Sequence, residues 1–175
     1  IYLTNGTENL LFYGINTQDL KQGDVISGAL DNGQLGAVRG KLYRYNNLPE
    51  FAFTDMDVQI QDSVTVVPKT ITVDQLGDNI NAYVEIENAK FVSTDNKKNL
   101  TFNAGETEFL VYNQFNVPIE ALEEGATYTL TGMGAVYKTT RQLYLTAFDK
   151  AGDNRVETTV VLGDSLVSLK VGNQY

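Results

Sequence analysis

Two stretches of the sequence, Thr7–Tyr13 (TENLLFY) and Glu106–Tyr112 (ETEFLVY), decide the fold because they are two copies of one pattern. Two further blocks recur after them in the same order. These are Leu20–Val25 (LKQGDV), which recurs as Leu122–Thr127 (LEEGAT), and Gly40–Tyr45 (GKLYRY), which recurs as Gly134–Thr139 (GAVYKT). Blocks that recur in order, roughly 100 residues apart, indicate a duplicated structural unit.

Most of the chain carries the sequence pattern of short β-strands. Its runs of β-branched and aromatic residues are bounded by Gly, Asn or Asp. The predicted strands cover residues 10–13, 24–27, 41–45, 64–67, 82–86, 127–130 and 143–145. Dipeptides such as Asn5-Gly6 and Asn46-Asn47 predict turns between strands. Helical signals are limited to single turns at 16–21, 72–78 and 118–123, and the second of these has a Thr cap and a Gly stop.

The strands and turns of each copy are typical of a small Greek-key barrel. We predict an all-β protein with two tandem OB-like barrels and a C-terminal β extension, and β-sandwich domains are the alternative architecture. The first unit spans residues 1–66, the second spans 67–153, and residues 154–175 form a hairpin-like extension. A strand over 83–92 opens the second unit and has no counterpart in the first, so we expect the first strand of that unit to be missing.

The composition excludes several kinds of chemistry. The 175 residues include no cysteine and no histidine, which excludes disulfides, thiolate metal sites, cysteine nucleophiles and the Ser-His-Asp triad. The acidic pair Asp55 and Asp57 does not fit a calcium loop, and no phosphate-binding glycine motif occurs. Carboxylate pairs can hydrolyse glycosides, but small OB barrels lack the deep pocket that this chemistry needs. We expect no cofactor, no metal site and no enzymatic activity.

The charge of the chain bears on its ligand. The sequence has 22 acidic and 13 basic residues, and its net charge of −9 is spread over both copies. An acidic surface opposes binding to a phosphate backbone, whereas it does not repel a neutral sugar. We therefore rank a glycan above single-stranded nucleic acid as an oligomeric ligand.

The candidate ligand-binding residues lie mainly on one predicted strand of the first unit. Side chains alternate along a strand, so every second residue shares a face. The residues on one face of this strand are Arg39, Lys41, Tyr43 and Tyr45, and Tyr137 and Arg141 of the second copy complete the candidate set. Aromatic and basic side chains on an OB sheet face bind oligomers by stacking and hydrogen bonding. The alternative interpretation is that these tyrosines pack between the two units.

Two parts of the sequence resemble a known family. Gly23-Asp24-Val25 followed by Gly40–Glu50 (GKLYRYNNLPE) resembles a pattern in the OB-fold domains of Bacteroidetes surface lipoproteins. Ile71–Leu76 and Tyr83–Ala89 are similar to the start of the second OB unit in the same proteins. The resemblance covers about residues 1–150 and implies an extracytoplasmic location, at the cell surface or in the periplasm. It also implies a lipid anchor on a segment outside this sequence, and many such proteins are labelled nucleic-acid binders by fold analogy alone.

The same resemblance implies a modification. Bacteroidetes attach O-linked glycans at Asp-Ser or Asp-Thr followed by an apolar residue. Residues 62–64 and 164–166 match this pattern, which makes Ser63 and Ser165 the candidate acceptors.

These observations favour a non-catalytic, extracytoplasmic binding or assembly module of a surface protein. A protein partner would dock by strand addition at an exposed edge strand or at residues 154–175. The alternative is an oligomer-binding protein that uses the aromatic strand face, with a glycan favoured over nucleic acid. We expect contact with a membrane only through the lipid anchor.

Overall fold

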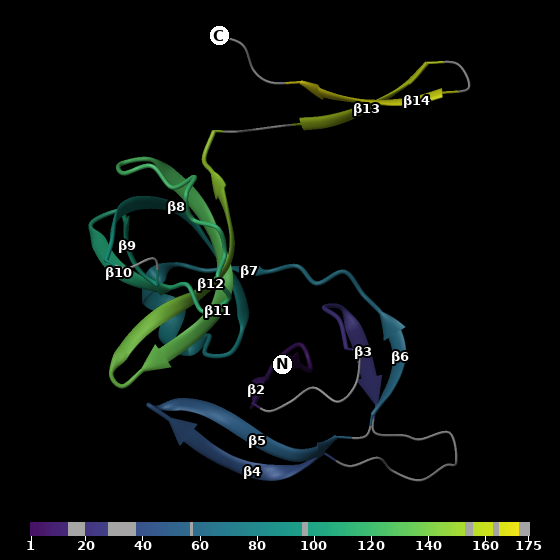
Figure 1. Cartoon of the computed structure of the whole chain (residues 1–175), viewed down its shortest axis with the longest axis vertical. Coiled ribbons are helices and arrows are strands. Elements are labelled where there is room, and N and C mark those ends of the chain that lie inside the picture. Colours follow the sequence, from purple (N-terminus) through teal and green to yellow (C-terminus); the bar gives the residue numbers. More distant parts are fainter. Residues whose placement is uncertain are drawn as a thin grey trace.

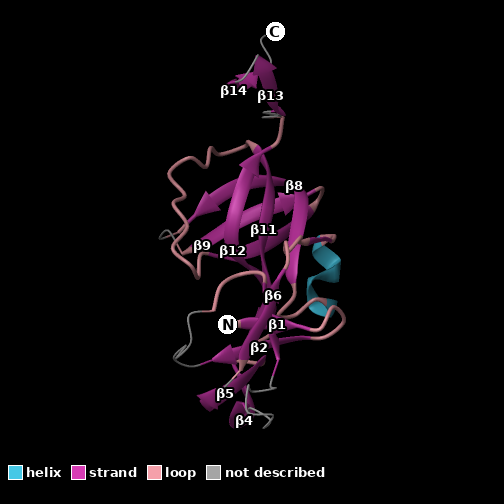
Figure 2. Ribbon diagram, turned by 90° about the vertical axis from the view of Figure 1, so that its right-hand side faces the viewer, coloured by secondary structure: helices cyan, strands magenta, loops and turns pink. Residues whose placement is uncertain are grey.

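The structure, a computed structural model, describes residues 1–13, 20–27, 38–56, 58–95, 98–152, 156–162 and 165–171. Side chains within these ranges are described except at 27, 38–39, 53–56 and 156–171. The described residues form β-strands and one 3₁₀ helix (Figure 2), which confirms the all-β class. None of the helical structure in these ranges has the length and hydropathy needed to span a bilayer.

The second unit is a closed ring of five strands, drawn in teal and green in Figure 1. Its elements are β7 (Lys69–Thr70), the helix η1 (Val73–Asp78), β8 (Tyr83–Thr94), β9 (Asn99–Ala104), β10 (Thr107–Tyr112), β11 (Thr127–Tyr137) and β12 (Thr140–Lys150). The ring follows the order β8-β9-β10-β12-β11, and it closes because β8 also pairs with β11. Neighbours in the ring are antiparallel except β10 and β12, which are parallel.

The interior of this ring holds the main hydrophobic core. Its most deeply buried side chains come from the strands and η1 and are Leu76, Val84, Ile86, Leu100, Phe102, Val111, Tyr128, Leu130, Leu143 and Leu145. The predicted helical turn at 72–78 is confirmed as η1. The backbone N–H of Thr72 donates to the Gln75 side-chain oxygen at 3.0 Å, and Leu76 is buried in the core.

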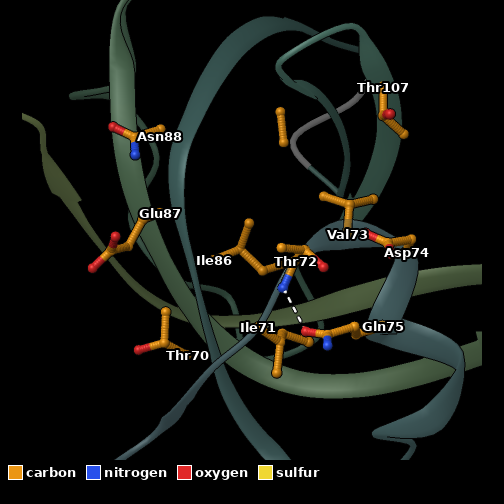
Figure 3. A pocket seen from close by; sticks show the side chains of 11 residues that line it. Thr70, Ile71, Thr72, Val73, Asp74, Gln75, Ile86, Glu87, Asn88 and Thr107 are labelled. Atoms are coloured by element: carbon orange, nitrogen blue, oxygen red, sulfur yellow. Dashed lines mark hydrogen bonds between the residues drawn. The ribbon is translucent and has the colours of Figure 1, made fainter.

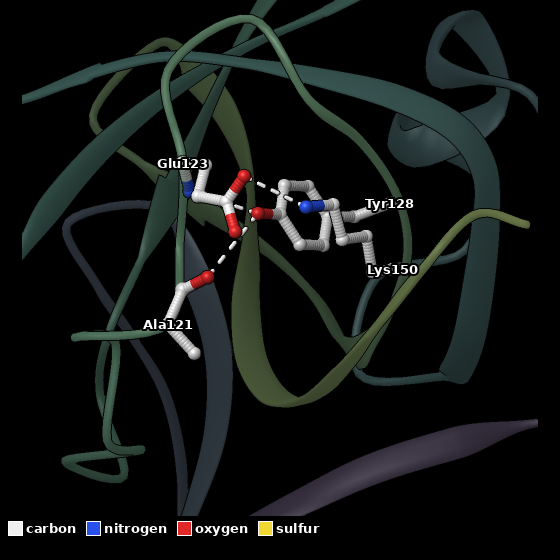
Figure 4. A network of polar contacts seen from close by, with 4 residues as sticks. All are labelled: Ala121, Glu123, Tyr128 and Lys150. Atoms are coloured by element: carbon white, nitrogen blue, oxygen red, sulfur yellow. Dashed lines mark hydrogen bonds and ion pairs between the residues drawn. The ribbon is translucent and has the colours of Figure 1, made fainter. Parts of the chain in front are cut away.

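A buried tyrosine fixes the loop that leads into β11 (Figure 4). The Tyr128 hydroxyl accepts the backbone N–H of Glu123 at 2.8 Å and donates to the Ala121 carbonyl at 3.3 Å. Lys150 Nζ forms an ion pair with Glu123 Oε2 at 2.7 Å. Loop 121–123 is therefore tied both to the barrel interior and to the end of β12.

The first unit contains an incomplete version of the same ring. Its strands are β1 (Tyr2–Thr4), β2 (Asn9–Tyr13), β3 (Asp24–Ser27), β4 (Val38–Tyr45), β5 (Leu48–Met56) and β6 (Gln59–Ser63). One sheet has the order β1-β2-β5-β4, and β3 pairs with β6 beside it. The β2–β5 pair is parallel, and the β1–β2 and β4–β5 pairs are antiparallel.

Strand order and register relate the two units. In order and direction, β1-β2-β5-β4 matches β9-β10-β12-β11. The equivalent cross-strand pairs are Leu3–Leu10 with Phe102–Phe109, and Phe12–Phe51 with Val111–Leu143. Among the described residues, no strand bonds to the outer edges of β1 and β4, where β8 lies in the second unit. The ring of the first unit is therefore open.

The second repeated block forms the same turn in both units. Gly23 and Gly125 both have positive φ, of 95° and 82°. The N–H of Asp24 donates to the Lys21 carbonyl, and the N–H of Ala126 donates to the Glu123 carbonyl. The Leu-x-x-Gly motif is thus a repeat in structure as well as in sequence.

The third repeated block needs a correction of two residues. Both hairpins have two-residue turns, because Tyr45 pairs with Leu48 and Tyr137 pairs with Thr140. Tyr45 is therefore the counterpart of Tyr137, and Gly40 matches Gly132 instead of Gly134. Residue type alone left two registers open, since β11 has glycine at both 132 and 134. The hairpin turn decides between them.

The two units meet at the outer side of the β11–β12 hairpin. A small buried cluster spans the junction and consists of Leu11, Leu48 and Ala135. The two hairpin turns also bond to each other. Lys138 N–H donates to the Asn46 carbonyl, and Asn47 Nδ2 donates to the Lys138 carbonyl, each at 2.6 Å. The junction is thus stabilised by apolar packing and by hydrogen bonds to backbone carbonyls.

Two predicted elements are wrong, and a third lies partly outside the described residues. Residues 64–67 form no strand but an irregular connection, and Val67 is 76% exposed. The Val64 N–H still donates to the Gly23 carbonyl at 2.8 Å, but in the described structure no strand pairing continues through residues 65–67. Residues 118–123 form turns and no helix. Most of the predicted turn at 16–21 falls outside the described ranges.

The C-terminal extension forms a separate hairpin. Its strands, β13 (Val156–Leu162) and β14 (Ser165–Val171), are antiparallel and form a sheet of their own. In both Figure 1 and Figure 2 this hairpin lies at the end of the molecule opposite β4 and β5.

Candidate functional site

One side of the β1-β2-β5-β4 sheet carries a concentration of tyrosines. Residues that pair directly across neighbouring strands share a face. Tyr43 pairs with Glu50, and Tyr13 with Ala52, on the two strands that flank β5. We call the surface made by Tyr2, Tyr13, Tyr43, Tyr45 and Glu50 the tyrosine face.

Glu50 organises the tyrosine face. Its side chain is buried, and the Tyr43 hydroxyl donates to its Oε2 at 2.7 Å. This hydrogen bond, together with desolvation and the nearby negative charge, raises the pKa of Tyr43 to about 12. The hydrogen bond also holds the Tyr43 ring beside β5.

Two tyrosines leave much of their rings open to solvent. Tyr13 is 62% exposed and Tyr45 is 60% exposed, although both belong to strands of the sheet. Lys41 is also exposed, two residues before Tyr43 on the same strand. The Arg39 side chain lies outside the described residues, so only its backbone can be placed, at an irregularity of the β4–β5 ladder.

Tyr2 and Tyr144 join the tyrosine face to the junction. Both pack against the cluster of Leu11, Leu48 and Ala135. Burial raises the pKa of Tyr2 and that of Tyr144, and the Glu50 charge adds to both shifts. Tyr2 and Tyr144 therefore pack between the units, although the sequence suggests this role for Tyr43 and Tyr45, and Tyr45 and Tyr13 are exposed.

Tyr137 and Arg141 do not belong to the tyrosine face. Tyr137 lies on the second unit, is 45% exposed, and has Lys138 Nζ at 5.4 Å from its ring centroid. Arg141 lines a cavity of about 240 Å³ between the units, together with Arg44 and Asn47. Neither guanidinium forms an ion pair with a carboxylate of the described residues. Of the predicted residues, Tyr43 and Tyr45 thus belong to the tyrosine face, Arg141 lines the cavity and Tyr137 lies at the tip of the second hairpin.

A second cavity, of about 490 Å³, lies beside η1 at one end of the closed ring (Figure 3). Its lining includes Thr70, Asp74, Glu87 and Asn88 but no aromatic and no basic side chain. The Gln75 oxygen already accepts the N–H of Thr72 there. The cavity offers neither a stacking surface nor a cation, which makes it a poorer ligand site than the tyrosine face.

The sequence reasoning missed Tyr13, Glu50 and Arg44. A signal for Glu50 was available, because a two-residue Asn46-Asn47 turn pairs Tyr43 with Glu50. Both turn residues have positive φ, of 47° and 71°, as a tight hairpin requires. Tyr13 could not be found this way, since its neighbour on β5 is set by a parallel pairing between distant segments.

The two candidate glycosylation sites differ in what can be described. Ser63 is exposed at the end of β6, where its N–H donates to the Asp62 side chain at 2.8 Å. The Ser165 side chain lies outside the described residues. Both sites remain predictions.

Comparison with protein-family models and with curated protein sequences finds no match for this chain. Among the described residues, no group of three or more acidic side chains lies close enough to hold a metal ion. The interpretation of the site therefore rests on its own geometry.

Proposed function

We propose that this chain is a non-catalytic binding and assembly module of an extracytoplasmic surface protein, and that its tyrosine face binds a neutral glycan. The observation that carries the proposal is the exposure of Tyr13 and Tyr45 on either side of β5. Aromatic side chains that are open to solvent on a sheet offer flat apolar surfaces to a ring-shaped ligand. The Tyr43–Glu50 hydrogen bond fixes the polar groups that lie between the Tyr13 and Tyr45 rings.

The architecture supports an OB-type assignment for both units. The second unit has five strands in a closed ring, and the first repeats four of them. Oligomers bind to the sheet face of such barrels. The family resemblance of Gly40–Glu50 falls on the β4–β5 hairpin, which presents Tyr43 and Tyr45.

The charge of the face favours a sugar over a nucleic acid. Lys41 is the one described basic side chain beside Tyr43 and Tyr45 on that side of β4, and the acidic Glu50 pairs with Tyr43. A single cation releases few counterions from a phosphate backbone. Stacking on a neutral sugar needs no net positive charge.

A binding experiment tests the glycan proposal. Wild-type chain is titrated with a panel of neutral oligosaccharides and with a ten-nucleotide thymidine strand. We expect a glycan to bind, and we expect Tyr13→Ala with Tyr45→Ala to weaken that binding at least about tenfold, since stacking contributes about 1–3 kcal/mol per ring. Val67→Ala is the control, because Val67 is exposed away from the face.

Three outcomes would contradict the glycan proposal. They are binding to none of the glycans, binding of the thymidine strand alone, and unchanged glycan affinity in the double variant. Tyr137→Ala tests how far the glycan-binding surface extends. A loss of glycan affinity in this variant would mean that the surface reaches the tip of the second hairpin.

Assembly with a protein partner is the second part of the proposal. The outer edges of β1 and β4 carry no partner strand among the described residues. Unpaired sheet edges are templates for strand addition.

A further inference from the structure

The open ring of the first unit leaves part of its inner surface uncovered. Leu42 is 66% exposed, and its side of the sheet also carries Leu10, Phe12 and Phe51, which are only partly buried. In the second unit, the counterparts of the last three are fully or almost fully buried. Monomeric proteins rarely leave such an apolar surface open without a partner for it.

The second unit shows what fills the equivalent position. There β8 pairs antiparallel with β9 on one side and with β11 on the other. Its inward residues Val84, Ile86 and Phe91 are buried in the core. A strand that filled the equivalent place in the first unit would therefore be extended, would be antiparallel to β1 and β4, and would carry apolar residues on its inward side.

The C-terminal hairpin contains a strand of this kind. In β14, alternate positions of the sequence are Val167, Leu169 and Val171. Among the described residues, β14 pairs with β13 alone. A two-stranded hairpin by itself is marginally stable in water, so β14 loses little when it leaves β13.

We propose that the open ring of the first unit accepts β14 of a second copy of this chain, between β1 and β4. The donor comes from another molecule because the hairpin and β4 lie at opposite ends of the same one (Figures 1 and 2). This inference rests on the assembly part of the proposed function and names its partner.

The proposed contact is head-to-tail. Each chain offers an acceptor at one end and a donor at the other, so the contact joins unlike surfaces and can propagate from chain to chain. The expected product is a series of oligomers that lengthens with concentration, and not a symmetric dimer.

Engineered cysteines test the contact directly, because the chain has no cysteine of its own. Leu42→Cys chain is mixed with Val167→Cys chain under mild oxidation, and mixed disulfides are measured. We expect the mixed pair to form at least about tenfold faster than the control pair of Val67→Cys with Val167→Cys, because only the first pair would be adjacent in the closed ring. Equal rates for the two pairs would overturn the proposal.

A second measurement uses charge instead of cross-linking. We call the space between β1 and β4 the slot. Leu42→Lys adds a charge to the slot without disturbing a buried side chain, whereas Val67→Lys adds the same charge elsewhere. In analytical ultracentrifugation we expect wild type and Val67→Lys to self-associate, and Leu42→Lys to need at least about tenfold higher concentration, because a charge would become buried. A wild type that stays monomeric, or a Leu42→Lys chain that associates like wild type, would overturn the proposal.

A peptide separates this inference from the proposed function. A synthetic peptide with the sequence of Tyr83–Thr94 reproduces the strand that closes the second unit. If it raises the melting temperature of the full chain while the cysteine and charge tests fail, the slot accepts a strand but not β14, and the assembly part of the proposed function survives. If the peptide also has no effect, both fail, whereas the glycan titration is independent of either result.

Discussion

The two units share one strand order, but they differ in how completely the side chains of these strands are buried. Phe102 and Phe109 pair across β9 and β10 and are buried inside the closed ring. Their counterparts Leu3 and Leu10 pair in the same register and stay half-exposed. Among the described residues, elements equivalent to β8 and η1 enclose the core in the second unit alone. A strand pattern can therefore specify the register of a sheet without supplying enough elements to enclose its core.

We expect the largest effect on stability when one phenylalanine of each unit is replaced by alanine. Phe102→Ala should lower the free energy of unfolding by about 3–5 kcal/mol, because it empties a filled core. Phe51→Ala should cost less than half of that, about 1–2 kcal/mol, because Phe51 is already partly in water. Urea unfolding of both variants measures the two losses. Equal losses would show that the first unit is filled in solution.

Removing the Tyr128 hydroxyl should have the next largest effect. In Tyr128→Phe the backbone N–H of Glu123 loses its acceptor, which should cost about 1–3 kcal/mol. The exposed Tyr137→Phe serves as the control and should change stability little. A Tyr128→Phe chain as stable as the wild type would mean that water replaces the lost bond.

In the two Leu-x-x-Gly turns, we expect the larger loss of stability in the first unit instead of the second. Gly125→Ala should cost about 1–2 kcal/mol, because alanine is strained at positive φ and a Cβ there meets only open space or the Lys90 side chain. Gly23→Ala should cost more, since its Cβ would lie 2.3 Å from the Val64 carbonyl oxygen. Thermal unfolding of both variants gives the order. A smaller loss for Gly23→Ala would show that the turn shifts away from Val64.

The smallest effect concerns alkaline pH. The pKa of Tyr43 is raised from 10.0 to about 12 in the folded chain, so its contribution to stability is complete below pH 10 and is lost as the pH rises toward 12. Spectrophotometric titration at the tyrosinate band should show late-ionising phenols, and one fewer of them in Tyr43→Phe, because the pKa values of Tyr2 and Tyr144 are also raised. Glu50→Gln should lower the pKa of Tyr43 toward the ordinary value. An unchanged number of late-ionising phenols in Tyr43→Phe would contradict the raised pKa of Tyr43.

The sequence predicted the all-β class and the turn residues because these depend on short-range chemistry. Asn46-Asn47 and Leu-x-x-Gly require particular backbone angles, and the structure has them at the predicted positions. The register of the third repeated block was set two residues off, since two glycines in β11 offered equivalent matches. Only the pairing of Tyr137 with Thr140 separates them.

The candidate site was harder to predict than the fold. Tyr43 and Tyr45 could be placed on one face from strand alternation alone. Tyr13 lies on the same face because β2 pairs parallel with β5. Arg141 lies elsewhere, in the cavity that it lines with Arg44. Both results depend on contacts between segments far apart in the chain, which no local pattern encodes.

The parallel pairs β2–β5 and β10–β12, which occupy equivalent places in the two units, have a consequence for folding kinetics. Leu110 reaches Gln142 only after the whole of β11 and the loop before it have been ordered, and Leu11 reaches Glu50 across a comparable stretch of chain. Contacts between residues so distant in sequence carry a loop-closure cost before they contribute stability, which slows folding. The local hairpins β11–β12 and β4–β5 should therefore form early, and the parallel ladders β10–β12 and β2–β5 should be the late, rate-limiting steps.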